Sequence, residues 1–482
     1  MIHIIKKQKN NEKIQALRRD GEKRFKNWLL ERPSLSLFLS GLISRLDKKS
    51  SLYLVGGIVR GIIQGKKDAH DIDMMVVNCD FEKLDKIFSS MKRAKIYKIK
   101  DYISAGKSFP VYRVSVRWTE EVLDIALART EISTGKGHRD FDINTNNVYA
   151  YEDSQRRDFT FNAIFFRIKK DKFNKVKGKI VDYQNGITAL INREIKAVGK
   201  PEDRFIEDPL RMLRAIRQKN QLGFKIEKNT WDSIKKLMPE LITTVSSERI
   251  STEIIKSFES NPVNSMIDFE KSSFFKIMVP EFYQNENLIE NTKIKLQKAY
   301  KYRDNNLIIC SLLLSEIAEY EIKQRINNIE KYNKENGKKA KKTNEPEFYI
   351  QEKTTEIIKR LSLPNQKYIY YAIYVMTVFI NLEKIEYSDA VIEELLRDCP
   401  EKDEIIKICD IQRQIGKTKY DIKAILKKLE ENPTLITGRE LIEAGYNFGA
   451  KTKIILRMLR QTQLDNKIND KDILLREGLK NV

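Results

Sequence analysis

The sequence LVGGIVR at residues 54–60, followed by DID at residues 71–73, decides how the first part of this chain folds. The apolar residues before the two glycines predict a buried strand. Gly56 and Gly57 then let the backbone turn sharply and leave its amides uncovered by side chains. The residues from Val59 onward predict the start of a helix, whose free amides and positive dipole end attract a phosphate. We therefore expect a strand, a glycine turn and a helix that together cradle a phosphate.

The DID triplet puts two acids close to that turn. Asp71 and Asp73 flank the start of the apolar run at residues 72–77, which predicts a second strand. Side chains two apart on a strand lie on one face, so both carboxylates point at the same place. Carboxylates that converge beside a phosphate are what holding magnesium against a triphosphate requires. An acid pair on a strand is more often a solvated edge, so the hypothesis depends on the motifs that follow.

Four further motifs follow in order along the chain. They are GKSFPV at residues 106–111, DIALARTE at 124–131, RRDFTFNA at 156–163 and RFIEDPLRMLRAIR at 204–217. With the glycine turn and the DID triplet, the series resembles the signature of class II nucleotidyltransferases, the family of tRNA CCA-adding enzymes and bacterial poly(A) polymerases. The resemblance implies an α+β fold, in which a polymerase-beta-like nucleotidyltransferase α/β head precedes an elongated all-helical neck, body and tail.

The same resemblance implies the chemistry, which is attack of an RNA 3′-hydroxyl on the α-phosphate of CTP or ATP with release of pyrophosphate. Asp124 falls where the family carries a third head carboxylate, and the apolar residues around it suggest a neighbouring strand. The implied catalytic residues, which also bind Mg2+, are Asp71, Asp73 and Asp124. The implied nucleotide-binding residues are Gly56, Gly57, Arg60, Arg157, Asp158, Asn162, Asp208, Arg211 and Arg214.

Within RRDFTFNA, the resemblance assigns Asp158 to the ribose hydroxyl and assigns Arg157 and Asn162 to phosphate or to the loop itself. The alternative is that Arg157 and Asp158 form a surface ion pair, which would be worth only about 0–1 kcal/mol. Residues 134–138 occupy the place of the family's flexible loop, and an intact loop argues against an enzyme that adds only C.

The choice of base can be argued from hydrogen-bonding chemistry. Asp208 and Arg211 are three apart in a helix that we expect to begin near Pro209, hence on one face. A carboxylate only accepts hydrogen bonds and a guanidinium only donates them. Cytosine and adenine both present an amine donor beside a ring-nitrogen acceptor, whereas guanine and uracil present the reverse. One pair therefore selects CTP and ATP together. Arg214 and Arg217, farther along this helix, suit phosphate or RNA, and the alternative for each is an exposed basic residue.

Two alternatives stay open. A poly(A) polymerase adding A tails to RNA 3′ ends would share every motif above, although residues 106–111 and 124–131 look closer to CCA-adding enzymes. Gly61 stands where the family usually has Asp. Together with the basic charge, this departure motivates a third hypothesis, an inactive head retained as an RNA-binding protein.

The composition indicates a polyanionic partner. The 482 residues carry a net charge of +22 and the pI is near 9.5, which favours RNA because neutralising phosphates releases counterions. Four cysteines without CxxC spacing predict neither zinc nor disulfides, which fits a reduced, cytoplasmic setting. No signal peptide is expected, and the most apolar stretch, residues 368–382, is shorter than a membrane span. The expected partners are tRNA or another RNA 3′ end, CTP and ATP, with no membrane and an open oligomeric state.

Shifts in pattern along the chain predict five parts. Residues 1–50 form a basic extension and a helix, which either lies on RNA or packs as an arm. The other expected parts are a catalytic head at 51–184, a helical neck with the nucleotide-selecting motif at 185–258, a helical body at 259–365 with a charged insertion near 319–345, and an RNA-binding helical tail at 366–482.

Overall fold

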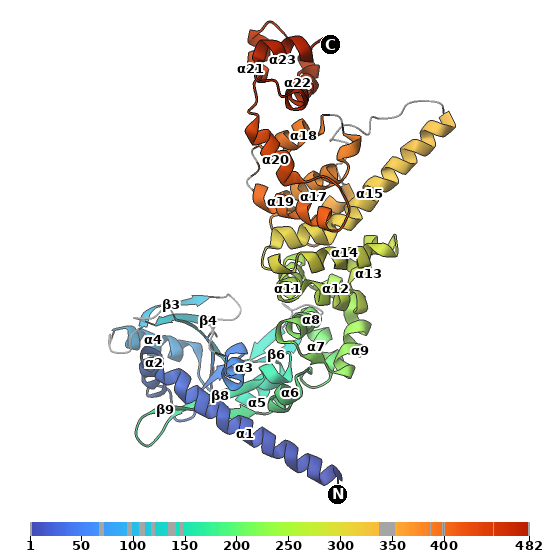
Figure 1. Ribbon diagram of the computed structural model, residues 1–482. Coiled ribbons are helices and arrows are strands. Elements are labelled where there is room, and N and C mark those ends of the chain that lie inside the picture. Colours follow the sequence, from blue (N-terminus) through green and yellow to red (C-terminus); the bar gives the residue numbers. More distant parts are fainter. Residues whose placement is uncertain are drawn as a thin grey trace. The chain divides into compact units, whose positions relative to one another are not determined.

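The computed structural model describes residues 2–66, 72–93, 99–105, 111–116, 121–133, 141–144, 148–336, 352–385, 387–397, 399, 401–446 and 448–480. The chain divides into two compact units, Met1–Val245 and Ser246–Val482 (Figure 1). The boundary between them lies inside the expected neck, and the finer division into five parts stays a prediction. No helix among the described residues is long and apolar enough to cross a membrane.

The first unit is built around a seven-stranded sheet with strand order β3-β4-β5-β2-β1-β8-β9 (Figure 1). Neighbouring strands are antiparallel except for β2 and β5, which are parallel. The strands are β1 Ser51–Val55, β2 Ile72–Val77, β3 Ile99–Ala105, β4 Val111–Val116, β5 Val122–Leu127, β8 Ile164–Lys170 and β9 Val176–Asp182. Two small sheets pair β6 Thr130–Ser133 with β7 Phe141–Asn144, and β10 Glu194–Ile195 with β11 Lys225–Ile226.

The described residues of the first unit also form ten α-helices, some before or between the strands of this sheet and others after its last strand. Those of the first unit are α1 Ile2–Leu30, α2 Pro33–Ile43, α3 Gly57–Gln64, α4 Phe81–Arg93, α5 Ala150–Gln155, α6 Gly186–Asn192, α7 Pro201–Glu207, α8 Leu210–Leu222, α9 Lys228–Leu237 and α10 Leu241–Thr244. Past residue 200 the described chain has one short strand, β11, so the predicted change from a mixed head to helices is confirmed.

The two faces of the sheet are covered differently. Helices α1 to α4 pack on one face, where Phe25 of α1 stacks on Phe166 of β8 with ring centroids 4.8 Å apart. On the other face, Tyr53 and Met75 pack with Ala150 of α5 in a buried apolar cluster. Because side chains alternate along a strand, this second face also carries the side chain of Asp73.

Helix α1 is an element that the sequence did not predict, whereas the expected helix after it is present as α2. Phe25, Trp28 and Leu29 of α1 are buried. The Arg24 guanidinium donates a hydrogen bond to the carbonyl of Ile63 at the end of α3. The last part of α1 is therefore part of the core of the head.

The described residues of the second unit form helices joined by turns and loops, with no strand. Its helices are α11 Ser247–Ser260, α12 Pro262–Lys271, α13 Phe274–Met278, α14 Asn287–Lys298, α15 Asn306–Asn336, α16 Glu352–Arg360, α17 Gln366–Ile380, α18 Ser388–Leu396, α19 Lys402–Gln414, α20 Ile422–Glu431, α21 Gly438–Glu443, α22 Thr452–Asn466 and α23 Lys471–Gly478. The first part of the expected charged insertion continues α15 to Asn336, and the rest lies outside the described residues.

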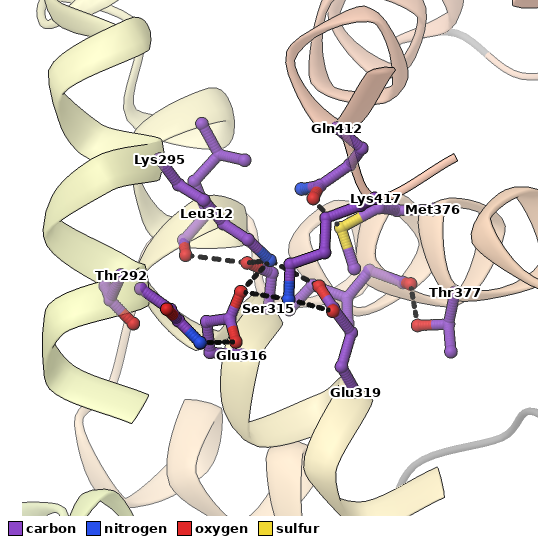
Figure 2. Close-up of polar contacts among 12 residues, drawn as sticks. Thr292, Lys295, Leu312, Ser315, Glu316, Glu319, Met376, Thr377, Gln412 and Lys417 are labelled. Carbon is purple, nitrogen blue, oxygen red and sulfur yellow. Dashed lines mark hydrogen bonds and ion pairs between the residues drawn. The ribbon is translucent and has the colours of Figure 1, made fainter. Parts of the chain in front are cut away.

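A buried ionic cluster joins three segments of this unit (Figure 2). Lys295 of α14 is fully buried, and its Nζ lies 2.9 Å from Glu316 Oε1 and contacts Glu319, both on α15. Lys417, after α19, lies 2.9 Å from one oxygen of each glutamate. Burial opposes ionisation of Glu316, but the two lysines outweigh it and hold its pKa below the ordinary value of 4.5. The pKa of Lys417 is raised above 10.5, because its glutamate partners outweigh the effect of burial.

This cluster predicts a pH-dependent contribution to the stability of the protein. A lowered carboxyl pKa stabilises the folded state above pH 4.5, and this contribution is lost as the pH falls through the folded value. We expect Glu316→Gln to reduce the free energy of unfolding by about 2 kcal/mol at pH 7, because a hydrogen-bonded charge is removed. Urea unfolding should show this difference shrinking below pH 4.5. Glu330→Gln, exposed on the same helix, is the control, and a difference that stays constant with pH would contradict the interpretation.

Candidate active site

The turn after β1 is made by one glycine in particular. Gly56 has φ +79°, a left-handed conformation that L side chains rarely adopt. A Cβ at this position would lie 2.9 Å from Oδ2 of Asp73. Gly57 instead begins α3, and a Cβ there would meet nothing closer than Arg60 Nη2 at 3.7 Å. Gly56 is therefore required both for the turn and for the approach of the Asp73 carboxylate to the backbone.

Two of the three predicted carboxylates are neighbours in the sheet. Asp73 of β2 is paired in register with Asp124 of the parallel strand β5, and with Val55 of β1 on its other side. Paired residues of neighbouring strands lie about 4.8 Å apart and present their side chains on the same face. Asp71 comes just before the first residue of β2 and lies outside the described residues, so its place beside the other two stays a prediction.

Arg113 is a charged residue of this face that the sequence analysis missed. It lies on β4 directly opposite Asp124. Its Nε and Nη2 each donate a hydrogen bond of 2.9 Å to one oxygen of the Asp124 carboxylate. Arg113 is 64% exposed and Asp124 34% exposed, so the pair faces solvent. The register that joins them depends on long-range strand pairing and has no local sequence signal.

The two carboxylates that the structure describes, those of Asp73 and Asp124, are suitable ligands for a divalent cation. Hard cations such as Mg2+ take carboxylate oxygens as ligands, and Asp73 and Asp124 supply them side by side, both partly exposed. Among the described residues, no three His, Cys, Asp or Glu side chains gather into a possible metal site. The third expected ligand, Asp71, is the residue that would complete such a set.

Arg156 and Arg157, which open RRDFTFNA, both bind the buried Asp153 of α5. Arg156 donates to its Oδ1 at 2.6 and 2.9 Å, and Arg157 donates to its Oδ2 at 2.8 and 2.9 Å. Burial opposes ionisation of Asp153, but the two guanidiniums outweigh it and lower its pKa. The alternative of a surface ion pair between Arg157 and Asp158 is therefore wrong, because Arg157 binds Asp153 and Asp158 binds Arg214.

Asp158 and Asn162 join the head to helix α8. Arg214 of α8 donates to Asp158 Oδ2 at 2.7 and 3.1 Å, and Asn162 Nδ2 donates to Asp158 Oδ1 at 3.1 Å. Arg60 of α3 donates to Asn162 Oδ1 at 2.7 Å. Burial opposes ionisation of Asp158, yet Arg214 and these hydrogen bonds hold its pKa at about 2. Three elements are thus connected by one polar network.

The structure corrects the expected arrangement of the base-selecting pair. Asp208 is extended, with φ −144° and ψ 95°, and α8 begins only at Leu210. The reason is Pro209, because the residue before a proline is driven from the helical to the extended region. Asp208 and Arg211 therefore do not share a helix face. The Arg211 guanidinium is buried and donates to Glu207 at 2.7 Å and to the carbonyl of Arg156 at 3.0 Å.

Two family models match this chain. One, described as "Poly A polymerase head domain", covers residues 52–196, and the other, "Probable RNA and SrmB- binding site of polymerase A", covers residues 223–285. The CCA-adding enzyme of Ligilactobacillus salivarius is 28% identical over 441 residues, which are 89% of this chain and 92% of the relative. The CCA-adding enzyme of Enterococcus faecalis is 35% identical over 204 residues, 42% of this chain and 44% of the relative.

Solved structures show the same fold. A CCA-adding enzyme in complex with ATP has a TM-score of 0.63 and 20% identity, covering 94% of this chain and 97% of that chain. The Thermotoga maritima CCA-adding enzyme complexed with tRNA has a TM-score of 0.58 and 20% identity, covering 91% of this chain and 97% of that chain. The predicted α+β fold, with a sheet-containing head followed by helices, is confirmed. Residues 52–196 therefore match the poly(A) polymerase head family, and most of the chain is similar to CCA-adding enzymes.

Proposed function

We propose that this chain is a CCA-adding enzyme, which adds C, C and A to the 3′ end of tRNA from CTP and ATP and releases pyrophosphate. The proposal rests on one observation above all: Asp73 and Asp124 are partners on parallel strands, and Gly56 packs directly against Asp73. The names of the relatives support it, since the curated proteins quoted above are CCA-adding enzymes. A cytoplasmic location follows from a tRNA substrate.

In this proposal Asp71, Asp73 and Asp124 hold Mg2+. When bound, the metal supplies a lower pKa for the attacking 3′-hydroxyl and neutralises charge on the triphosphate and its leaving group. The chain's own residues bind the nucleotide and orient its triphosphate. Gly56 leaves the backbone open to the triphosphate at the start of α3, and Arg60 adds a fixed positive charge there. No protein nucleophile takes part, so positioning and charge stabilisation carry the rate.

The remaining predicted residues take supporting roles. Arg157 fixes α5 through Asp153, and Asp158 holds Arg214 while its backbone leads into the segment that carries Asn162. Residues 51–184 would then carry catalysis, residues 185–258 nucleotide selection, and the helical residues 259–365 and 366–482 the grip on RNA. The overall positive charge of the chain suits that last task.

In this proposal Asp208 and Arg211 select the base together, Asp208 from the extended residue before α8 and Arg211 from its first turn. The hydrogen bonds from Arg211 to Glu207 and to the Arg156 carbonyl hold its guanidinium in one orientation. The extended Asp208 carries its carboxylate just before α8, where Oδ1 accepts from the Leu210 amide at 3.3 Å. A pair fixed in this way can accept from an exocyclic amine and donate to a ring nitrogen, which only cytosine and adenine offer together.

Asp208→Ala is expected to relax base choice more than it slows catalysis. Each mismatched polar group costs about 1–3 kcal/mol, so the preference for CTP over UTP and for ATP over GTP should fall by about 5- to 150-fold. The check is the ratio of kcat/KM values for the four nucleotides, with Asp203→Ala, exposed on α7, as the matched control. Unchanged ratios would show that Asp208 does not read the base.

The proposed activity is tested with a tRNA transcript that lacks its 3′ CCA, incubated with CTP, ATP and Mg2+. Growth by three nucleotides of sequence CCA is the expected result. An unstructured RNA with the same 3′ end is the control and should stay unextended. A long A tract on either RNA would instead identify a poly(A) polymerase, and binding without any incorporation would identify an inactive head that serves as an RNA-binding protein.

A further inference from the structure

Gln218 of α8 is a buried amide to which the activity above gives no role. It is 4% exposed, and its Oε1 accepts a hydrogen bond of 3.2 Å from Nδ2 of Asn162. Gln218 lies seven residues after Arg211 and four after Arg214, so all three occupy one face of the helix. This face of the nucleotide-selecting helix therefore ends in a polar group that points into the head.

The orientation of the Asn162 amide depends on its three partners. Its Oδ1 accepts from Arg60, while its Nδ2 donates to Asp158 and to Gln218. An amide group has two N–H donors on one end and only an acceptor on the other. If the amide flipped, its N–H groups would face the Arg60 guanidinium and its oxygen would face two further oxygens. Gln218 thus supplies one of the two acceptors that keep the amide in place.

Arg60, which donates to the oxygen of the Asn162 amide, lies beside the glycine turn. Arg60 belongs to α3, the helix that starts at Gly57, and its guanidinium also lies over the Phe161 ring at 5.5 Å. Burial lowers the pKa of Arg60, with Asp158 acting in the opposite direction, so its partners must compensate for lost solvation. A change in the Asn162 amide would therefore alter the direction in which Arg60 presents its charge.

We infer that Gln218 is a positioning residue for the incoming nucleoside triphosphate. Its side-chain carbonyl fixes the Asn162 amide, which in turn aims Arg60 at the glycine turn. The triphosphate-binding helix α3 and the nucleotide-selecting helix α8 are thereby held in one arrangement. This inference rests on the proposed function, because it takes the ligand to be CTP or ATP.

The experiment measures the binding of CTP and of ATP to the full chain by calorimetry, with thermal melting as the check on folding. Gln218→Met keeps the size of the side chain and removes the acceptor. It should weaken binding of both nucleotides by about tenfold, the value of a buried hydrogen bond. Gln218→Glu keeps an acceptor oxygen and should restore most of the affinity. Gln221→Met, exposed on the same helix, is the matched control and should bind like the unsubstituted chain.

A double-variant cycle separates positioning from a general structural effect. Arg60→Ala should weaken binding by itself, and adding Gln218→Met to it should cause little further loss, because both act through Asn162. Additive losses, or unchanged binding in Gln218→Met, would overturn the inference. Failure of the unsubstituted chain to bind either nucleotide is a different result, since it would refute the proposed function and this inference with it.

Discussion

Asp73→Asn is expected to lower the rate of nucleotidyl transfer by about a thousandfold or more, the equivalent of about 4 kcal/mol in the transition state. The amide has the size and shape of the carboxylate but lacks the charge that a divalent cation needs from its ligand. Asp73 has two structural relations that make it sensitive. It is the strand partner of Asp124, and its carboxylate lies against the backbone at Gly56. Asp124→Asn should cause a loss of similar size.

The measurement is single-turnover incorporation of CTP into tRNA that lacks CCA, with melting temperature recorded for each variant. Both substituted positions are partly exposed, so the folded state should be retained. Asp171→Asn is the control, because this carboxylate accepts backbone N–H groups in the turn between β8 and β9 and lies away from the glycine turn in the sequence. Retention of a tenth or more of the activity by a folded Asp73→Asn chain would contradict a catalytic role for that carboxylate.

Asp153→Ala is expected to lower the free energy of unfolding by about 3–5 kcal/mol, because it leaves two largely buried guanidiniums without their shared carboxylate. Asp153 is 0% exposed and accepts four hydrogen bonds from Arg156 and Arg157. Its loss should also free the backbone that leads to Asp158, so nucleotide binding should weaken together with stability.

Urea unfolding of the full chain measures this effect, and Glu152→Ala on the same helix is the control. Glu152 only accepts from the Tyr149 amide at the start of α5, so its loss should cost about 1 kcal/mol. The pKa of Asp153 is lowered from 3.8, so its contribution is present above that pH and is lost as the pH falls further. A destabilisation at pH 7 no larger than that of Glu152→Ala would refute the argument.

Local sequence was sufficient for the elements that hold the glycine turn. An apolar run, two glycines and a second apolar run specify β1, the start of α3 and β2, because strand formation, turn conformation and helix initiation are decided within a few residues. The family motifs then extended this prediction to a head followed by helices. The expectation that Asp208 shares a helix face with Arg211 was wrong, because Pro209 forces the residue before it to be extended and α8 begins only at Leu210.

Contacts that depend on long-range pairing could not be predicted from the sequence. Arg113 meets Asp124 only because β4 and β5 are paired in one register. Gln218 meets Asn162 across 56 positions of chain. Helix α1 was missed for another reason: it is highly charged, and among the side chains that the structure describes, Phe25, Trp28 and Leu29 near its end are the large apolar ones that are buried. No amphipathic pattern spans the whole helix, so hydrophobic periodicity gave no signal.

The central claim is that carboxylates of the DID triplet and of β5 gather around a divalent cation beside the turn at Gly56. Crystals of the full chain grown with Mn2+ and a CTP analogue that cannot be hydrolysed would test it, because anomalous scattering locates the manganese. The account predicts manganese bound by Asp73, Asp124 and Asp71, with the triphosphate at the start of α3. Manganese on other carboxylates, with Asp124 still bound to Arg113 and no nucleotide near Gly56, would contradict it.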